Sequence, residues 1–255
     1  MDKPAVAEQV AAAQPDAVVH LAAISFVGHS DEAAFYAVNV VGTANLLSAL
    51  AAISKPPHKV LLASSSAVYG NCQKSPISER QPPSPVNHYG MSKLAMEYMA
   101  RTFIDRLPIV FTRPFNYTGP GQASNFIIPK LVKHYVLSEP AIELGNLNVE
   151  REFNDVRTVC EVYLAVLEHG KPREGYNICS GHAHTLQEVM DILTDLTGHT
   201  LRTSVNPELV RANEIHRLCG DPSKLNTLLS RSHTHIVQRD LRETLRWMLG
   251  ANLPH

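Results

Sequence analysis

Short apolar runs rich in β-branched residues alternate along this chain with longer segments in which apolar residues recur at helical spacing. The runs at residues 17–22, 59–63 and 109–112 predict buried strands, and the segments 31–52 and 89–106 predict helices between them. This order of elements is typical of βαβ units built around a parallel sheet. We therefore expect an α/β fold with a Rossmann-like parallel sheet.

The pattern becomes less regular after Gly121, where shorter elements alternate with turns. It predicts a helix capped by Asp155, further helices over residues 125–137, 186–196 and 238–249, and short strands over residues 141–144 and 176–178. We accordingly divide the chain into a Rossmann-like domain, residues 1–140, and a smaller mixed α/β lobe, residues 141–255. The smaller lobe is expected to interleave with the end of the sheet.

The 255 residues carry 23 Lys and Arg against 24 Asp and Glu, which gives a formal net charge of -1. Such a balance provides no single-sign field to bind nucleic acid or an anionic membrane. Apolar stretches such as residues 17–24 end well short of the roughly 20 residues that a membrane-spanning helix needs. The N-terminus shows no secretory pattern. We expect a cytoplasmic protein with no nucleic-acid or membrane partner.

The cysteine and histidine spacings predict neither disulfides nor a metal centre. The four cysteines lie far apart and form no C-x-x-C pair (Cys72, Cys160, Cys179 and Cys219). Two His-x-His pairs begin at His182 and His233, but no carboxylate or cysteine lies nearby in sequence to complete a tetrahedral ligand set. No metal site is expected.

The segment from Tyr89 to Lys93 opens a predicted helix and places a phenol and an ammonium four residues apart, on one helix face. A phenol with a pKa of about 10 exchanges protons poorly at neutral pH, and a nearby cation lowers that pKa by stabilising the phenolate. The pair is therefore a candidate general acid or base. The alternative interpretation is an ordinary solvated helix face.

Three serines, Ser64, Ser65 and Ser66, follow the predicted strand at residues 59–63. Open parallel sheets bind ligands in the crevice at the carboxyl ends of their strands. A serine placed there can donate a hydrogen bond to a substrate carbonyl. The alternative is that these serines only cap a turn.

These elements belong to an ordered set of motifs by which the chain resembles the extended short-chain dehydrogenase/reductase family over nearly its whole length. The matching segments are 20–23 (HLAA), 39–43 (NVVGT), 64–70 (SSSAVYG), 89–93 (YGMSK) and 113–122 (RPFNYTGPGQ). Within the family, the segments similar to GDP-4-keto-6-deoxy-mannose reductases are 145–147 (GNL), 151–157 (REFNDVR), 176–181 (YNICSG) and 211–214 (RANE). The resemblance implies reduction of the C4 ketone of a GDP-linked 6-deoxyhexose with NAD or NADP as cofactor.

The resemblance also implies a role for each matching residue. Tyr89 would protonate the developing alkoxide, Lys93 would lower the pKa of Tyr89 and bind the nicotinamide ribose, and Ser65 would hydrogen-bond the carbonyl oxygen. The cofactor would contact Lys93 together with Ala22, Ala23, Asn39, Pro114 and Phe115. The nucleotide sugar would contact Asn116, Arg151, Arg211 and Glu214. Residues 1–140 would then bind the dinucleotide, residues 141–255 the substrate, and a homodimer is expected through the helices at 31–52 and 89–106.

Two positions separate the related chemistries. The sugar 4,6-dehydratases that resemble this chain carry a carboxylate where Ala67 stands, and the 3,5-epimerase-reductases carry a cysteine there and a histidine near the residue that is Phe126 here. Because neither side chain here transfers protons, dehydration and 3,5-epimerisation are disfavoured. Two alternatives stay open: a UDP-sugar 4-epimerase, which needs only the Ser/Tyr/Lys set, and a catalytically silent nucleotide-sugar-binding module.

The chain departs from the family pattern at its N-terminus. Family members begin with a strand and a Gly-x-x-Gly-x-x-Gly turn that lets a helix N-terminus approach the pyrophosphate, whereas this sequence begins about 50 residues later in the pattern. None of its 13 glycines forms that turn. A start codon assigned too late, a truncation rescued by a partner chain, and a degenerate protein are the competing explanations. We expect the strand at 17–22 to have an unpaired edge, and a complete chain of this kind to bind dinucleotide weakly and to have low stability.

Overall fold

Four parallel strands form the central sheet of the computed structural model, which describes residues 2–210 and 214–252. Their order is β1 (Ala17–His20), β2 (Lys59–Ala63), β3 (Ile109–Pro114) and β8 (Gly175–Ile178). Each neighbouring pair is parallel. Nearly every side chain of β2 and β3 is buried, as is usual where helices cover both faces of a parallel sheet. The α/β fold with a Rossmann-like sheet is confirmed.

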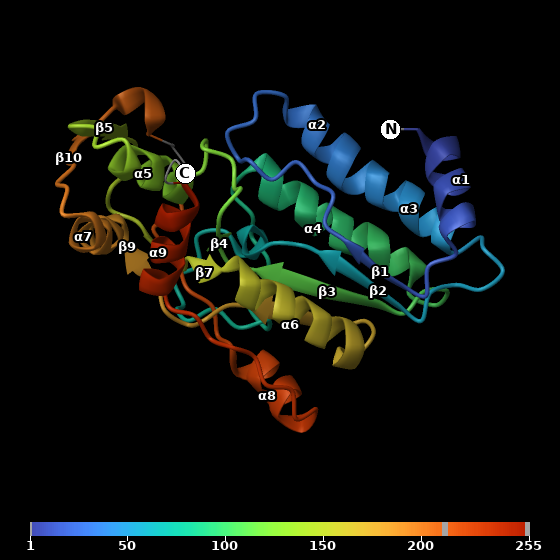
Figure 1. The fold of residues 1–255 in the computed structure, drawn as a ribbon. Helices are drawn as coiled ribbons and strands as arrows, with labels where there is room; N and C mark the ends of the chain where they lie inside the picture. Colours follow the sequence, from blue (N-terminus) through green and yellow to red (C-terminus); the bar gives the residue numbers. More distant parts are fainter. Residues whose placement is uncertain (1, 211–213, 253–255) are drawn as a thin grey trace.

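Helices cover both faces of this sheet (Figure 1). One face carries α1 (Lys3–Ala13), α2 (Glu32–Tyr36), α3 (Thr43–Leu50) and α4 (His88–Ala100), and the other carries α6 (Val156–His169) and α8 (Ser223–Arg231). Side chains of the central strands alternate between the two layers. Leu62 and Phe111 pack with α3 and α4, whereas Leu61 and Val110 pack with α6. This period of two follows from the pleat of a strand.

β1 forms one edge of the sheet. It pairs with β2, and no described residue pairs with its outer side. Val19 in this strand is 38% exposed, and Leu21 just beyond it is 58% exposed. The unpaired edge predicted from the sequence is therefore confirmed within the part of the chain that the structure describes.

α2 and α3 are joined by a π-helical stretch, Ala37–Gly42, into one helix, Glu32–Leu50. By length and composition alone this helix is apolar enough to cross a membrane. Its inner side packs against α1 and α4 and carries the buried polar residues Asn39 and Thr43. The helix predicted over residues 31–52 is therefore a layer of this fold.

A second hydrophobic core lies among α5 (Ile127–Val136), α7 (Leu186–Thr197) and α9 (Leu241–Asn252). Three small sheets accompany it: β5 (Ala141–Leu144) with β10 (Arg202–Val205), β6 (Glu150–Arg151) between β9 (His184–Thr185) and β11 (Arg217–Leu218), and β4 (Tyr117–Thr118) with β7 (Asn154–Asp155). The chain enters this lobe with α5, returns to the main sheet for α6 and β8, and ends in α9. The division at residue 140 stays a prediction.

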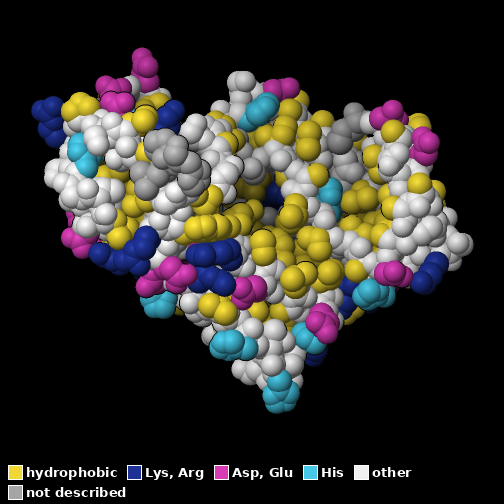
Figure 2. Space-filling model, viewed as in Figure 1, with side chains coloured by type: hydrophobic (Ala, Val, Ile, Leu, Met, Phe, Trp, Pro, Cys, Tyr) yellow, Lys and Arg dark blue, Asp and Glu magenta, His cyan; other side chains and the backbone are white. Residues whose placement is uncertain are grey.

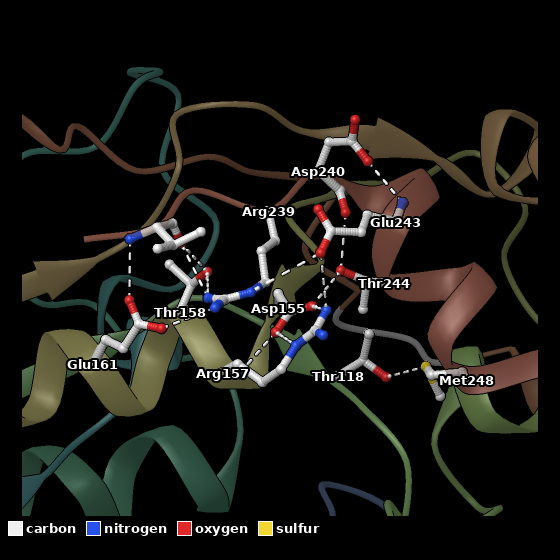
Figure 3. A network of polar contacts seen from close by, with 11 residues as sticks. Thr118, Asp155, Arg157, Thr158, Glu161, Arg239, Asp240, Glu243, Thr244 and Met248 are labelled. Atoms are coloured by element: carbon white, nitrogen blue, oxygen red, sulfur yellow. Dashed lines mark hydrogen bonds and ion pairs between the residues drawn. The ribbon is translucent and has the colours of Figure 1, made fainter. Parts of the chain in front are cut away.

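A network of polar side chains joins α6 to α9 and to the segment that precedes α9 (Figure 3). Asp155, the N-cap of α6, accepts hydrogen bonds from Arg157 and from the Thr244 hydroxyl of α9. Burial alone would raise the pKa of Asp155, but these bonds hold it below its ordinary value. Arg239 adds an ion pair to Glu161 at 3.0 Å. The network fixes α9, and with it the second core, against the helix that covers the sheet.

Candidate active site

A cavity of about 1100 Å³ opens between the carboxyl ends of the sheet strands and the second lobe. Figure 2 shows the molecule hollowed there, with hydrophobic side chains gathered around the opening. Residues that follow β1, β2 and β3 line one side, and residues from α5, β6 and the segment 214–218 line the other. Open α/β sheets bind ligands at this edge. The cavity is therefore the candidate site.

Ser65 stands two residues beyond β2, at the start of a 3₁₀ turn, Ser66–Tyr69. Its Oγ accepts a hydrogen bond from the backbone amide of Ala67 at 3.1 Å, so the serine caps this turn. The same side chain lines the cavity with Tyr89 and opposes the rise in the pKa of the Tyr89 phenol. Ser65 therefore closes the turn and also presents its hydroxyl to the site.

Tyr89 is the second residue of α4, whose N-cap Asn87 accepts a hydrogen bond from the Gly90 amide at 2.8 Å. The first turn of α4 packs directly onto the 3₁₀ turn that follows Ser65. A Cβ atom on Gly90 would stand 2.6 Å from the carbonyl oxygen of Ala67. Because Gly90 has no side chain, α4 approaches closely enough for the Tyr89 phenol to reach Ser65.

We expect Gly90→Ala to destabilise the fold by about 1–3 kcal/mol, because backbone must shift to relieve the contact with Ala67. The shift should also lower activity by moving Tyr89 away from Ser65. Gly250→Ala is a matched control, since Gly250 is also helical and an added Cβ would meet nothing within 4 Å. Alanine there should stabilise by up to about 1 kcal/mol. Urea unfolding measures both, and equal stabilities of the two variants would contradict the close-contact argument.

Lys93 lies one turn beyond Tyr89 on α4 and is 5% exposed. Its Nζ donates to the carbonyl oxygen of Ala63, the last residue of β2, at 2.7 Å. Burial lowers the pKa of Lys93 to about 8, and the Glu97 carboxylate opposes that shift. The ammonium is therefore fixed at the carboxyl end of β2, where Ser65 also lies.

The pKa of Tyr89 corrects one expectation from the sequence. Burial raises this pKa to about 12, and the hydrogen bond with Ser65 opposes the rise. The pKa is therefore raised and not lowered as predicted, because the burial of the phenol is the largest effect on it. The phenol is therefore held in its neutral, proton-bearing form.

A buried ion pair lies behind these residues. Arg113 at the end of β3 donates from Nε and Nη2 to the two carboxylate oxygens of Glu97, at 2.9 and 2.6 Å. Its Nη1 also donates to the Tyr69 hydroxyl at 2.9 Å, and that hydroxyl donates to Asn177 at 2.7 Å. The network joins α4, β3, β8 and the turn after β2, so it holds the elements that carry the site. The sequence analysis missed it, although Glu97 lies four residues beyond Lys93 on the same helix face.

The residues predicted to hold a nucleotide sugar are partly bonded to each other. Asn116, Arg151 and Glu214 all line the cavity. Arg151 donates from Nη2 to Glu214 Oε1 at 2.8 Å and also to the backbone carbonyl of Ile215. Two of the residues predicted to contact the nucleotide sugar are therefore paired with each other. Arg211 lies outside the described residues.

Comparison with known proteins identifies this architecture. The model of the GDP-mannose 4,6-dehydratase family matches residues 1–243. The chain belongs to this family. It is 34% identical over 232 residues to the GDP-6-deoxy-D-talose 4-dehydrogenase of Aggregatibacter actinomycetemcomitans, across 91% of this chain and 79% of that protein. It is 33% identical over 242 residues to the GDP-6-deoxy-D-mannose reductase of Pseudomonas aeruginosa, again across 91% and 79%.

Solved structures agree with this family assignment. The RMD protein of Pseudomonas aeruginosa complexed with NADPH superimposes with a TM-score of 0.84 at 32% identity, covering 93% of this chain and 81% of that one. MoeE5 in complex with UDP-glucuronic acid and NAD gives a TM-score of 0.86 at 26% identity, covering 98% and 83%. The predicted resemblance to the extended short-chain dehydrogenases/reductases is confirmed.

Members of this dehydrogenase/reductase family use a nicotinamide dinucleotide, and the described residues fit its reactive half. Ala23, Lys93, Pro114 and Phe115 all line the cavity. The Lys93 ammonium would bind ribose hydroxyls, and Pro114 with Phe115 offers an apolar surface for the nicotinamide ring. Ala22 is exposed and lies outside the cavity lining. Its contact with the cofactor stays a prediction.

Asn39 supports the cavity wall from behind. It is buried in the π-helical stretch and does not line the cavity. Its Oδ1 accepts from the backbone amide of Ile24 at 2.9 Å, and its Nδ2 donates to the Ile24 carbonyl and to Ser92 Oγ at 3.1 and 2.9 Å. Asn39 therefore clamps the segment after β1 to α4, while its predicted contact with the cofactor stays a prediction.

The carboxylates of the cavity are each bonded to a basic side chain. Among the described residues, Glu32 and Glu214 are the acidic side chains that line it, and they bind His88 at 3.0 Å and Arg151 at 2.8 Å. Ala67 lines the cavity at the position where the 4,6-dehydratases carry a carboxylate. Within residues 2–210 and 214–252, no group of three or more His, Cys, Asp or Glu side chains is arranged to hold a metal ion.

Proposed function

We propose that this protein reduces the C4 ketone of a nucleotide-activated 6-deoxyhexose of the GDP-4-keto-6-deoxy-mannose type, with NADH or NADPH. The observation that carries the proposal is that Ser65, the neutral phenol of Tyr89 and Lys93 line one cavity, with the Lys93 ammonium fixed at the end of the strand that Ser65 follows. Two relatives support the substrate class, since their names specify oxidation or reduction of GDP-6-deoxyhexoses.

Ser65 and Tyr89 would together receive the ketone oxygen. A reduced nicotinamide bound against Pro114 and Phe115 would supply the hydride to C4. As negative charge develops on the oxygen, the Ser65 hydroxyl donates a hydrogen bond to it and Tyr89 transfers its proton, which completes the alcohol. Lys93 stabilises the phenolate that Tyr89 becomes.

The surroundings of this set favour reduction over dehydration. A 4,6-dehydratase needs a further group beside the serine to take a proton from the sugar and help expel water. Ala67 supplies only a methyl group there, and the two acidic side chains of the cavity are held by His88 and Arg151. With a bound reduced nicotinamide, hydride transfer at C4 needs no side chain beyond Ser65, Tyr89 and Lys93.

The proposal is tested by adding freshly prepared GDP-4-keto-6-deoxy-mannose to the purified protein with NADPH or NADH and following oxidation of the cofactor. We expect oxidation that depends on the sugar, and stronger thermal protection by GDP than by UDP. Protection by UDP together with interconversion of UDP-sugars at C4 would assign a UDP-sugar 4-epimerase instead. Protection by GDP with no oxidation of either cofactor would assign a silent binding module.

We expect kcat/KM for the reduction to fall as the pH rises through about 8, where the Lys93 ammonium loses its proton. The neutral amine no longer stabilises the phenolate. The effect of Lys93 on stability has the opposite sign. An unfolded lysine keeps its proton up to a pH of about 10.5, so between about pH 8 and 10.5 the unfolded state binds more protons than the folded state. In that range this group makes the free energy of unfolding rise with pH. A kcat/KM profile that is flat across pH 8 would contradict the assignment.

We also propose that the protein works as a cytoplasmic homodimer. The helix Glu32–Leu50 and α4 expose apolar side chains, with Val41 53%, Met91 41% and Tyr98 63% accessible. Light scattering of the purified protein should give the mass of two chains. Val41→Asp should shift that mass towards one chain, and a wild-type mass of a single 28.1 kDa chain would contradict the dimer.

A further inference from the structure

Two phenylalanine rings from opposite walls of the cavity meet edge to face. Phe26 belongs to the segment that follows β1, and Phe126 is the residue immediately before α5 in the second lobe. Their ring centroids lie 5.7 Å apart, with the ring planes at 78°. Both rings line the same cavity as Ser65 and Tyr89. They form an apolar surface in the wall of this cavity.

Phe26 belongs to a segment that packs against the start of α4 through His29 and Phe35. Its ring lies against the backbone of its own segment. A Cβ added to Gly28 would stand 2.8 Å from a carbon of the ring. Three residues further on, the His29 ring packs on Phe35 at 5.7 Å, and Phe35 packs on Tyr89 at 6.2 Å. The segment that carries Phe26 is thus anchored to the turn of α4 that carries the phenol.

Phe126 is fixed by backbone hydrogen bonds at the start of α5. Its amide donates to the Ala123 carbonyl, and its carbonyl accepts from the Lys130 amide, both at 3.1 Å. The next residues, Ile127 and Ile128, pack towards the second core. The ring therefore points from a rigid helix start towards Phe26, and the apolar surface is formed without rearrangement of either lobe.

A 6-deoxyhexose carries one apolar substituent, a methyl group on C5. C5 itself is bonded directly to C4. When C4 lies at Ser65 and Tyr89, the methyl group must contact the wall beside them. We infer, on the basis of the proposed function, that Phe26 and Phe126 receive this methyl group and select 6-deoxyhexoses against sugars with a C6 hydroxyl. A C6 hydroxyl would lose its bound water there and would face two rings that offer no ordinary hydrogen-bond partner. Burying an unpaired hydroxyl costs free energy.

The same wall also disfavours a sugar with a C6 carboxylate. Among the described residues, the Lys and Arg side chains that line the cavity are Lys93, Lys130 and Arg151. Each is engaged with another group: the Ala63 carbonyl, the Glu143 carbonyl and the Glu214 carboxylate, respectively. Within the described residues, a carboxylate lying against the two rings would therefore have to compete with these partners for a cation.

The test uses a matched pair of sugars, GDP-6-deoxy-D-mannose and GDP-mannose, or their C4 epimers, which differ only in the oxygen on C6. Oxidation with NADP or NAD is followed for wild type and variants. We expect wild-type kcat/KM to favour the 6-deoxy sugar by on the order of 100-fold, the discrimination that an apolar pocket achieves against an added hydroxyl. Phe26→Ser and Phe126→Ser should each reduce this ratio by about tenfold or more, since a hydroxyl of the protein then meets the C6 hydroxyl.

Leu164→Ser is the control, because Leu164 is 65% exposed on α6 and lies outside the cavity, and it should leave the ratio unchanged. Phe126→Tyr keeps the ring and adds a hydroxyl, so it should also lower the ratio. It serves as the test if a serine variant does not fold. A wild-type ratio near one, or a ratio unchanged in all three cavity variants, would overturn the inference while oxidation of the sugars still supported the proposed function. Failure of the folded wild type to bind or oxidise either sugar would overturn the proposed function itself.

Discussion

Replacing Tyr89 with phenylalanine should lower kcat for C4 reduction by about 10³-fold, within the range that general acids contribute. The substitution removes the proton that the alkoxide needs, and it leaves the ring in place against Phe35, 6.2 Å between centroids. Because burial raises the pKa of the phenol to about 12, the hydroxyl keeps its proton throughout the neutral range. Steady-state kinetics with NADPH should show the loss in kcat, with KM for the sugar little changed.

Tyr98→Phe is the matched control for that experiment. Tyr98 lies on the same helix, is 63% exposed and does not line the cavity, so its phenol oxygen should be dispensable. If the Tyr89 variant kept more than a tenth of the wild-type kcat, the proton would come from another group and the mechanism would have to be revised. Binding of GDP, followed by thermal protection, should remain unchanged in both variants.

Glu97→Gln should destabilise the protein by about 3–5 kcal/mol, the usual cost of leaving one member of a buried ion pair without its partner. The side chains of Arg113 and Glu97 are 10% and 3% exposed, and their closest oxygen–nitrogen distance is 2.6 Å. Burial by itself would lower the pKa of Arg113, yet the Glu97 carboxylate holds it above the ordinary value. An arginine guanidinium stays protonated in proteins, so its charge is uncompensated when the Glu97 carboxylate is removed. Urea unfolding measures the change.

Two further variants make that prediction specific to the buried pair. The double variant Glu97→Leu with Arg113→Met removes both charges and should recover much of the lost stability. Asp105→Asn breaks the exposed pair with Arg173, 2.7 Å apart, and should change stability little because solvent screens that interaction. Equal stabilities of Glu97→Gln and wild type would show that the buried pair contributes nothing net.

The main elements of the fold were predictable because their signals are local. The strands at residues 59–63 and 141–144 were placed to the residue. The two-residue strands β4, β6, β7, β9 and β11 were not predicted. Each is too short to show a period of two, and each exists only because a segment distant in sequence pairs with it.

The sequence by itself determined which chemical groups meet: the four-residue spacing puts Tyr89 and Lys93 on one helix face, and the run before Ser65 puts that hydroxyl at a strand end. Only the tertiary structure decided how those groups behave. It bound the Lys93 ammonium to the Ala63 carbonyl and raised the pKa of Tyr89. It paired Arg151 with Glu214 and brought Phe26 to Phe126. Desolvation and contacts across many residues depend on how distant segments pack, and no local pattern records them.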